Sequence, residues 1–462
     1  MPGRIEFTMG FKTHKAAVKE EGDRGFRIYI LGSFSGCSDV GWEQRKIRRI
    51  DIDSFDNVMT QIMPSLEISP GSKLQFETLD DFHPDAWLKK VPILADLQQL
   101  KMELINPATA ARAAAKIRAF LPADTKSETV IQRQEATESQ EEMLERLLGR
   151  KPERATGETT DAMDRYIDRL VSPHVTKDTE PQHQALITVI DTTISQFLLT
   201  LLHRPDFQAL EALWRASEAL VNEESTDQQN FFLVDVSQAE LLAEHRKGDG
   251  GFERILLQHV RSGDGEQDVI LIGDYCFSDS VDDRELLGFC SLLAETCGAN
   301  FLGAAGLGLI ENTVFGAAEN IRNWKQYLDQ IRADRLVLAY PRYLQRLPYG
   351  TKREPIEALV FEECSKIPLP DELLWGNPAF ICARAMIRSR QEQQTDEPGF
   401  FGEIPAFAFD RDGEQVLQPG TETVLNEALA NVLVSQGITP LLGFRQRQGV
   451  RLMPITTLSE HS

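Results

Sequence analysis

The sequence contains the stretch GFRIYILGSFSG at residues 25–36, an apolar run that ends in glycine and serine. Residues 26–31 predict a short strand, because their apolar character is continuous and glycines follow it. Downstream, residues 79–87 (LDDFHPDAW) place acids and Pro84 at the start of a helix, where they complement the free N–H groups of the first turn. The N-terminal part of the chain is therefore predicted to contain a strand and a capped helix.

A second pair of distinctive blocks, RPDFQALEALWR (204–215) and LWGNPA (374–379), lies further along the chain. Between them, strands are predicted at 231–236, 269–272, 301–304 and 336–338, and helices at 238–245 and 282–297. Alternation of this kind predicts an α/β core with a largely parallel sheet and flanking helices. After Phe400 the pattern changes to short strands and turns, so we expect a mixed sheet.

The N-terminus predicts a separate arm strand. Ile5, Phe7, Met9 and Phe11 are apolar residues at period two, which gives a strand with one apolar face. A polar stretch separates this strand from the next one, so we expect the arm to pair with something other than its neighbour in sequence.

A polar, acidic segment predicts the domain boundary. Residues 122–160 contain few apolar side chains, apart from a short apolar helix predicted at 143–148. We therefore expect a region at 1–121, a linker with a short helix at 122–160, and a second region at 161–462.

Composition narrows the class of protein. The chain has 462 residues and a formal net charge of −22, which argues against a nucleic-acid-binding protein because such proteins present a basic face. No apolar run approaches the ~20 residues that cross a bilayer, and the N-terminus lacks an apolar signal region. We expect a cytoplasmic protein without membrane insertion.

Cysteine and histidine spacings predict no metal site or cofactor. None of the six cysteines forms a Cys-x-x-Cys pair, and none of the eight histidines lies at zinc-ligand spacing. No P-loop and no Gly-x-Ser-x-Gly motif is present. His83, beside Pro84 at a helix start, is expected to form a local hydrogen bond.

One alternative remains an enzyme or ligand-binding protein. Asp274 follows a predicted strand, where α/β enzymes often place an acid, and a glycine-rich loop spans Gly303–Gly308. Asp279, Asp282 and Asp283 could add metal ligands, but capping of the following helix explains them with fewer assumptions. The spacing of these glycines is not that of a dinucleotide-binding motif and favours a tight turn at the end of a strand.

Aromatic and arginine residues suggest a binding surface. The segment YPRYLQRLPYG, residues 340–350, combines tyrosine, arginine and proline, which are common in interfaces and also in ordinary loop packing. Trp214, Arg342, Tyr343 and Trp375 are the residues we single out as core or interface positions. The two uses fit this pattern equally well.

These blocks together resemble the contractile sheath of the type VI secretion system. Residues 4 to about 120 resemble the small sheath subunit (TssB/VipA), through LGSFSG (31–36), FDNVM (55–59) and LDDFHPD (79–85). Residues from about 143 to 455 resemble the large subunit (TssC/VipB), through 204–215, LIGDY (271–275), PRYL (341–344), RLPYG (346–350) and 374–379. Two proteins that normally form a heterodimer thus resemble consecutive parts of one chain.

The resemblance implies a structural role and no enzymatic activity. Such subunits polymerise around an inner tube protein above a baseplate and contract to drive secretion, and the AAA+ unfoldase ClpV dismantles the contracted sheath. In this family ClpV binds an N-terminal helix of the large subunit. The corresponding residues here are Met143, Leu144, Leu147 and Leu148, which fit an accessible recognition helix and an ordinary docking helix equally well.

Two departures from the family pattern shape the hypothesis. Fusion fixes the stoichiometry and makes pairing of the two regions intramolecular. The likeness also stops near Ser462, so we expect the family's C-terminal extension, which accepts arm strands, to be missing while the donor arm is kept. We therefore expect a fused sheath protomer, or a protein that joins or caps a sheath end.

Overall fold

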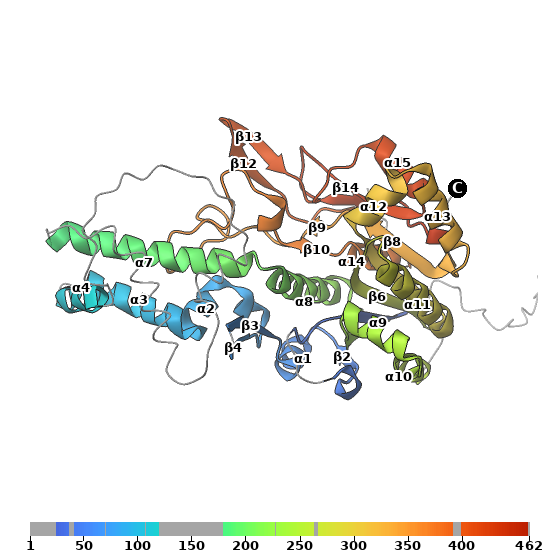
Figure 1. Ribbon diagram of the computed structural model, residues 1–462, viewed down its shortest axis with the longest axis horizontal. Helices are drawn as coiled ribbons and strands as arrows, with labels where there is room; N and C mark the ends of the chain where they lie inside the picture. The colour runs from blue at the N-terminus through green and yellow to red at the C-terminus, as the bar shows by residue number, and fades with distance from the viewer. Residues whose placement is uncertain are drawn as a thin grey trace, which may run out of the picture.

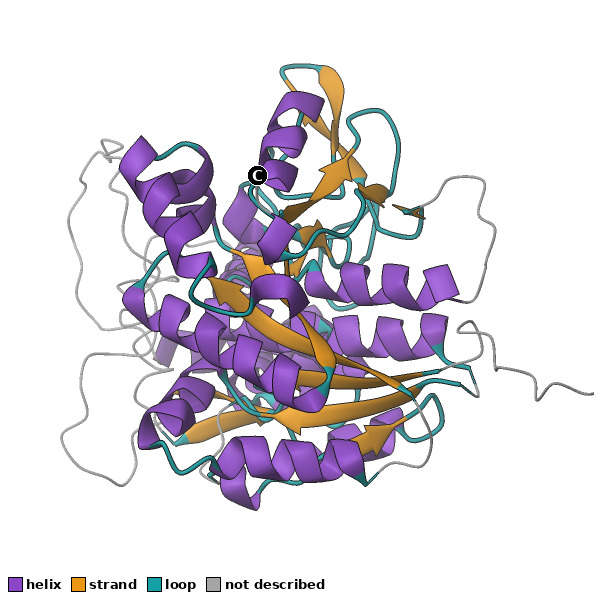
Figure 2. Cartoon of the chain, turned by 90° about the vertical axis from the view of Figure 1, so that its right-hand side faces the viewer, coloured by secondary structure: helices purple, strands orange, loops and turns teal. Residues whose placement is uncertain are grey.

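The computed structural model describes residues 25–36, 41–69, 71–106, 108–119, 179–226, 228–262, 267–390 and 399–460. Its main element is a nine-stranded sheet in the order β11-β15-β14-β8-β7-β6-β1-β5-β2, with helices on both faces (Figure 1, Figure 2). The predicted α/β class with a mixed sheet is confirmed. The predicted arm strand and the linker at 122–160 lie outside the described residues.

Strand β1 (Phe26–Gly32) lies inside this sheet, between β5 (Asn230–Asp235) and β6 (Asp268–Phe277), and runs parallel to both. All seven residues of β1 are buried. A strand covered on both faces needs a continuous apolar run, which is what the sequence provides here. The N-terminal strand therefore joins two strands that come from much later in the chain.

The remaining strands extend the sheet in both directions from β1. Beyond β6 follow β7 (Ala299–Ala305), β8 (Leu336–Tyr340), β14 (Ile438–Gly443), β15 (Val450–Leu452) and β11 (Phe400–Phe401), and β2 (Arg48–Ile50) forms the other edge. Pairs from β5 to β14 are parallel. Strands β2, β15 and β11 pair antiparallel. Both edges are therefore short strands, which limits uncontrolled pairing with other chains.

The side chains of β1 alternate between two hydrophobic cores. Ile28 and Ile30 belong to one core, and Tyr29 and Leu31 belong to the other. The first face is covered by α8 (Pro205–Glu224) and α14 (Ala379–Arg390), and the second by α9 (Gln238–Lys247), α10 (Gly251–Arg261), α11 (Val281–Cys297), α12 (Leu307–Val314) and α13 (Ala318–Leu328). Both cores thus contain side chains from the N-terminal and the C-terminal part of the chain.

A helical extension projects to the left in Figure 1 and consists of α7 (Thr179–Leu202), α3 (Pro92–Ile105) and α4 (Ala110–Ala119). The segment His183–Leu202 of α7 is long and apolar enough to cross a membrane by length and composition, so the expectation that no such stretch exists was wrong. Leu186, Ile190, Ile194, Leu198 and Leu201 of α7 are buried in the first core. These contacts make α7 a core helix of this fold.

The smaller N-terminal elements pack on both faces of the sheet. They are η2 (Trp42–Gln44), α1 (Phe55–Ile62), β3 (Ser65–Ser69), β4 (Ser72–Gln75), η3 (Leu79–Phe82) and α2 (Pro84–Lys90). Of these, η2 lies in the second core beside α10, and the others lie in the first core. Helices α1 and α3 begin at Phe55 and Pro92. His83 caps α2, because its Nδ1 accepts a hydrogen bond of 3.2 Å from the backbone N–H of Asp85. The predicted local role of His83 is thus confirmed.

The C-terminal part adds short elements around the sheet. These are β9 (Tyr343–Leu344), β10 (Trp375–Gly376), β12 (Phe407–Arg411), β13 (Glu414–Gln418), α15 (Glu427–Ser435) and the short 3-10 helices η5 (Ala333–Arg335), η6 (Pro370–Glu372) and η7 (Leu458–Glu460). The turn predicted at Asp412 and Gly413 joins β12 to β13, and both residues have positive φ, 57° and 89°. Asparagine, aspartate and glycine are the residues that tolerate this conformation.

Candidate functional site

The distinctive sequence blocks meet at the carboxyl edge of β1 and β6. Gly32 ends β1, and a Cβ atom there would lie 2.7 Å from Leu213 Cδ2 of α8 and 3.3 Å from Asp274 Cβ of β6. A larger residue at this position would require the end of the Leu213 side chain to move. Trp214, beside Leu213, donates a hydrogen bond of 3.0 Å from Nε1 to the carbonyl oxygen of Phe34. Helix α8 therefore holds the end of the N-terminal strand.

Aromatic rings fill the space between α8 and the N-terminal elements. The Trp214 ring meets Phe34 and Phe55 edge-on, with centroid distances of 5.1 and 5.7 Å. Two turns earlier on α8, Phe207 contacts Trp87 of α2 at 5.0 Å. All of these rings are buried. Edge-to-face pairs contribute about 0.5–1.5 kcal/mol beyond the burial of their area, so this contact is a strong link between the two regions.

Strand β1 also fixes the end of α10 on the other face of the sheet. Arg27 donates from Nη2 to the carbonyl oxygen of His259 at 3.1 Å and from Nη1 to that of Val260. The Tyr29 hydroxyl and His259 Nδ1 are 3.0 Å apart. Burial, and then the charge of Arg27, lower the pKa of His259. A neutral ring can accept the phenol proton, so strand and helix are joined without adding a buried charge.

A buried cluster of charges joins α8 to the loop after β9. Glu211 is fully buried, and its Oε1 lies 2.8 Å from Arg346 Nε and 2.7 Å from Arg215 Nε. Arg346 Nη1 also pairs with Glu363 Oε2 at 2.8 Å, and the backbone N–H of Tyr349 donates to the same oxygen at 2.6 Å. Burial alone would raise the pKa of Glu211, but Arg346 and Arg215 outweigh it and hold that pKa below its usual value.

A second charge cluster joins α8 to α14. Glu224 Oε1 lies 3.2 Å from Arg384 Nε and 2.7 Å from Arg388 Nε. Arg384 pairs in addition with Glu223 and with Glu403, which follows β11. Removing one member of a buried group like this leaves an uncompensated charge. The cluster therefore makes the relative position of α8, α14 and the β11 edge strongly specific.

Asn377, in the LWGNPA block, joins β6 to the start of α14. Its Nδ2 donates to the carbonyl oxygens of Gly273 (3.4 Å) and Tyr275 (3.2 Å), where β6 has an irregular register. Its Oδ1 accepts a hydrogen bond of 3.0 Å from the backbone N–H of Ala379 at the start of α14. Burial raises the pKa of Asp274 to about 6, and the hydrogen bond with Asn377 only partly offsets this. Asp274 thus belongs to a structural junction.

The other acids considered as metal ligands are engaged in helix capping and ion pairing. Ser280 Oγ accepts from the backbone N–H of Asp283 at 3.0 Å, and Asp282 and Asp283 lie in the first turn of α11 as predicted. Asp279 pairs with Arg284 Nε at 2.7 Å. Among the described residues, no group of three or more His, Cys, Asp or Glu side chains could hold a metal ion.

The glycine-rich segment Gly303–Gly308 ends β7 and begins α12. A Cβ atom on Gly303 would lie 2.9 Å from the Phe277 ring, and one on Gly306 would lie 3.1 Å from Cys276 Sγ. Close packing against the end of β6 therefore explains these glycines. Gly303 lies inside β7, and Gly306 is the single residue between β7 and α12 and has φ −79°, so a direct strand-to-helix junction stands where a tight turn was expected.

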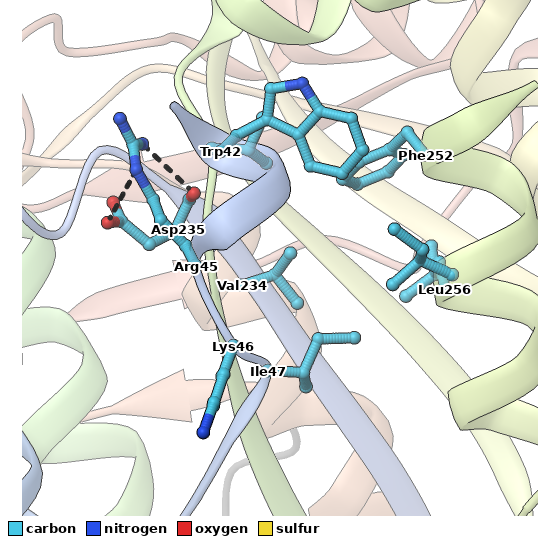
Figure 3. Close-up of a pocket in the computed structure, with 10 residues that line it drawn as sticks. Trp42, Arg45, Lys46, Ile47, Val234, Asp235, Phe252 and Leu256 are labelled. Atoms are coloured by element: carbon cyan, nitrogen blue, oxygen red, sulfur yellow. Dashed lines mark hydrogen bonds and ion pairs between the residues drawn. The ribbon is translucent and has the colours of Figure 1, made fainter. Parts of the chain in front are cut away.

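Cavities give little space for a ligand near these residues. A cavity of about 20 Å³ lies between η2 and α10, lined mainly by apolar side chains such as Trp42, Ile47 and Leu256 (Figure 3). Ligand pockets usually enclose about 300–1,000 Å³. A second hollow of about 400 Å³ lies at the amino ends of the central strands β1, β6 and β7 and is open. Its Arg390 pairs with Asp268.

The structure does not gather the four singled-out interface residues into one site. Trp214 and Tyr343 are buried in the first core, while Trp375 belongs to a small third core. Strands β9 and β10 place Gly376 opposite Tyr343, so Trp375 lies next to it along the ladder. Arg342 is exposed and pairs with Glu422 at 2.6 Å. A role of these residues in contacts between subunits stays a prediction.

Two groups of predicted site residues lie outside the described residues. They are the arm residues Ile5, Phe7, Met9 and Phe11 and the recognition-helix residues Met143, Leu144, Leu147 and Leu148.

The charged clusters around Glu211 and Glu224 were not predicted from the sequence. Glu211 lies on the apolar stripe of α8, four residues after Phe207 and three before Trp214. An acid on such a stripe is buried, and a buried acid needs a cationic partner. This signal could have predicted a buried pair, but the partner Arg346 lies 135 residues away, and only the tertiary structure identifies it.

Comparison with known proteins agrees with this arrangement. Residues 184–455 match the EvpB/VC_A0108 tail sheath N-terminal domain family, VipB. Residues 2–143 match the type VI secretion system family described as VipA, VC_A0107 or Hcp2. The type VI secretion system sheath protein TssC1 of Pseudomonas aeruginosa is 26% identical over 353 residues, which cover 69% of this chain and 71% of that protein.

These matches confirm the resemblance seen in the sequence blocks. The VipB match spans more than half of the 462 residues, and the VipA match precedes it in the same polypeptide. The chain therefore belongs to the type VI secretion tail sheath family and is a structural sheath component that carries VipA-type and VipB-type sequence in one chain.

Proposed function

We propose that this protein is a sheath protomer with both the VipA-type and the VipB-type part, which associates with further copies around an inner tube and contracts to drive protein secretion. The position of β1 carries the proposal. A strand from the VipA-type region fills the sheet between β5 and β6 of the VipB-type region. Covalent linkage replaces a bimolecular association by an intramolecular one, so each protomer contains both parts in a one-to-one ratio.

The charged and aromatic contacts support a mechanical role. A subunit that transmits force must move as one body, and buried ion clusters and close ring packing make a unique arrangement costly to distort. Asp274, Asp279 and Asp283, the acids that an enzyme would use, take part in hydrogen bonds and ion pairs of this framework. We therefore propose a non-enzymatic protein that works in the cytoplasm.

Three further features of the proposal concern partners. The arm residues Ile5, Phe7, Met9 and Phe11 would add a strand to a neighbouring protomer, since main-chain hydrogen bonds give affinity in strand addition. The residues Met143, Leu144, Leu147 and Leu148 would form the helix that the unfoldase ClpV binds. The inner tube protein and the baseplate are the partners expected at the sheath lumen and end.

Negative-stain electron microscopy of the purified protein tests the proposal. We expect long tubes from the protein alone. Deletion of residues 1–12 should abolish them, whereas deletion of 143–148 should leave assembly intact and remove only disassembly by ClpV with ATP. Failure to form tubes, combined with shortened tubes when the protein is mixed with separate small and large subunits, would instead assign it to a sheath end.

A further inference from the structure

The outer face of α10 is basic although the chain as a whole is acidic. Arg254, Ile255 and Arg261 are exposed, and Ile255 retains 43% of its surface. Glu253 is the acid of this helix and lies in its first turn. Within the described ranges, no ion pair engages Arg254 or Arg261. On the adjacent α9, by contrast, Arg246 is paired with Asp282 and Glu285.

Two cations beside β2 continue this surface. Lys46 and Ile255 line the same small cavity, and Figure 3 shows Lys46 turned away from it while Ile47 is directed toward Leu256. Arg49 lies opposite Phe232 in the ladder, so both side chains are on one face of the sheet. The Phe232 ring is 5.0 Å from His259 of α10. Lys46, Arg49, Arg254, Ile255 and Arg261 are called the basic face below.

An exposed acidic surface, opposite in charge to the basic face, lies in the loop after β9. Between Ile356 and Glu363 the side chains alternate, and Leu359 and Phe361 are buried while Val360 is 84% exposed. Glu354, Glu357 and Glu362 surround Val360 and are exposed. These three acids and Val360 are called the acidic segment. No ion pair engages its acids in the part of the chain that the structure describes, and Arg353, the nearest cation in sequence, donates instead to the carbonyl oxygen of Ala408.

The acidic segment is held in place although it is irregular. The backbone N–H of Glu357 donates to Asp85 Oδ2 at 3.1 Å, and Lys101 Nζ donates to the carbonyl oxygen of Ala358 at 3.1 Å. Glu362 Oε1 accepts from the backbone N–H of Thr351 at 3.0 Å. A fixed segment that exposes a large aliphatic side chain has little entropy to lose on binding, as an interface requires.

We propose that the basic face of one copy docks on the acidic segment of the next copy, resting on the proposed function as a self-assembling protomer. Each surface has one exposed aliphatic side chain among charges of one sign, and the signs are opposite. The acidic segment packs on α2 and α3, whereas α10 lies at the lower right of Figure 1, away from them. One copy therefore cannot satisfy both surfaces itself, and such a contact propagates from copy to copy.

A second copy is the occupant that the charges favour. The chain carries a net charge of −22, so the rest of the molecule is acidic. A polyanion such as a nucleic acid would be repelled by the body of the protein even where it met the basic face. A second copy supplies a fixed acidic surface of the required size.

Charge reversal tests the contact. R254E/R261E and E354K/E357K should each lower the fraction of the full-length protein that sediments as assemblies by about tenfold at low salt, and the difference from wild type should shrink at higher salt because salt screens exposed charges. Mixing the two variants should restore assembly, because each native surface then meets its partner and the two reversed surfaces also complement each other. K89E/R411E is the matched control for R254E/R261E, since it changes the net charge by the same amount at two exposed cations outside the basic face.

The outcomes separate the two proposals. Assembly of both reversed variants at the level of the control, or no recovery in the mixture, would overturn the contact while leaving the protomer proposal standing. A wild-type protein that neither assembles nor self-associates in sedimentation would overturn both. Circular dichroism melting of every variant should match wild type, since all four reversed positions are exposed.

Discussion

The N-terminal region contributes strand β1 to the centre of the sheet and helix α3 to the helical extension, and these two parts differ in how they are packed. Strand β1 is buried on every residue and hydrogen-bonded on both sides to strands of the C-terminal region. Helix α3 packs on α7 through Leu94, Leu97 and Leu104, and its outer side leaves Met102 67% exposed. The comparison indicates that the centre of the sheet is one cooperative unit, whereas the helical extension is attached through one face and can loosen alone.

The charge cluster beside the central unit should give the largest effect. R346M removes the partner of two buried acids, Glu211 and Glu363, and should lower the free energy of unfolding by about 3–5 kcal/mol. The same substitution at the exposed Arg342, which pairs with Glu422 near the surface, should cost less than about 1 kcal/mol. Urea denaturation checks both, and equal losses would contradict the comparison.

A cavity in β1 should weaken the whole molecule. Ile30→Ala creates a void between strands and should cost about 3–4 kcal/mol. Hydrogen exchange should then rise in β5 and β6 as well as in β1. Ile52→Ala is the control, because Ile52 is 55% exposed and its truncation should change stability by less than about 0.5 kcal/mol.

A cavity in the extension should act locally. Leu97 is 3% exposed between α3 and α7, and Leu97→Ala should cost about 2–3 kcal/mol in the extension. We expect faster hydrogen exchange in α3, α4 and the first half of α7, with β1 and β6 unchanged. Faster exchange throughout the sheet would show that the extension and the centre unfold together.

Asp274 should make the centre sensitive to pH. Its pKa is about 6 in the folded protein and 3.8 as the unperturbed value, so the folded state binds the proton more tightly. Stability contributed by this group is therefore full below pH 4 and is lost as the pH rises to about 6. Asp274→Asn should be near wild type at pH 4 and more stable by about 2 kcal/mol at pH 7. Melting experiments on both proteins over this range check the divergence, and equal stability at pH 7 would contradict the raised pKa.

The smallest effect concerns the ion pair on the extension. Lys101 Nζ lies 2.6 Å from Asp191 Oδ1, and the aspartate is partly exposed. Lys101→Met should cost about 0.5–1 kcal/mol, because solvent screens such pairs. Double-mutant analysis with Asp191→Asn measures the coupling energy of the pair. A coupling energy as large as the loss of stability expected for R346M would contradict the difference between the helical extension and the centre of the sheet.

Local patterns were enough to predict much of the fold. The apolar run of β1, the proline at the start of α3, and the period of α11 all define their elements from neighbouring residues. Helices α10, α12 and α13 were missed, since each is short and lacks a proline or a side-chain cap at its start. The sequence blocks also indicated the sheath family, because each block has a defined composition and order.

The way in which the two regions combine is visible only in the folded chain. The strand at residues 26–31 and the apolar stripe of α8 can be predicted from the sequence, because these properties depend on neighbours within a few residues. The sequence alone could not determine that β1 enters between β5 and β6, or that Glu211 meets Arg346 across 135 residues. Those contacts depend on packing among distant segments, where shape and charge must be satisfied together in the folded chain.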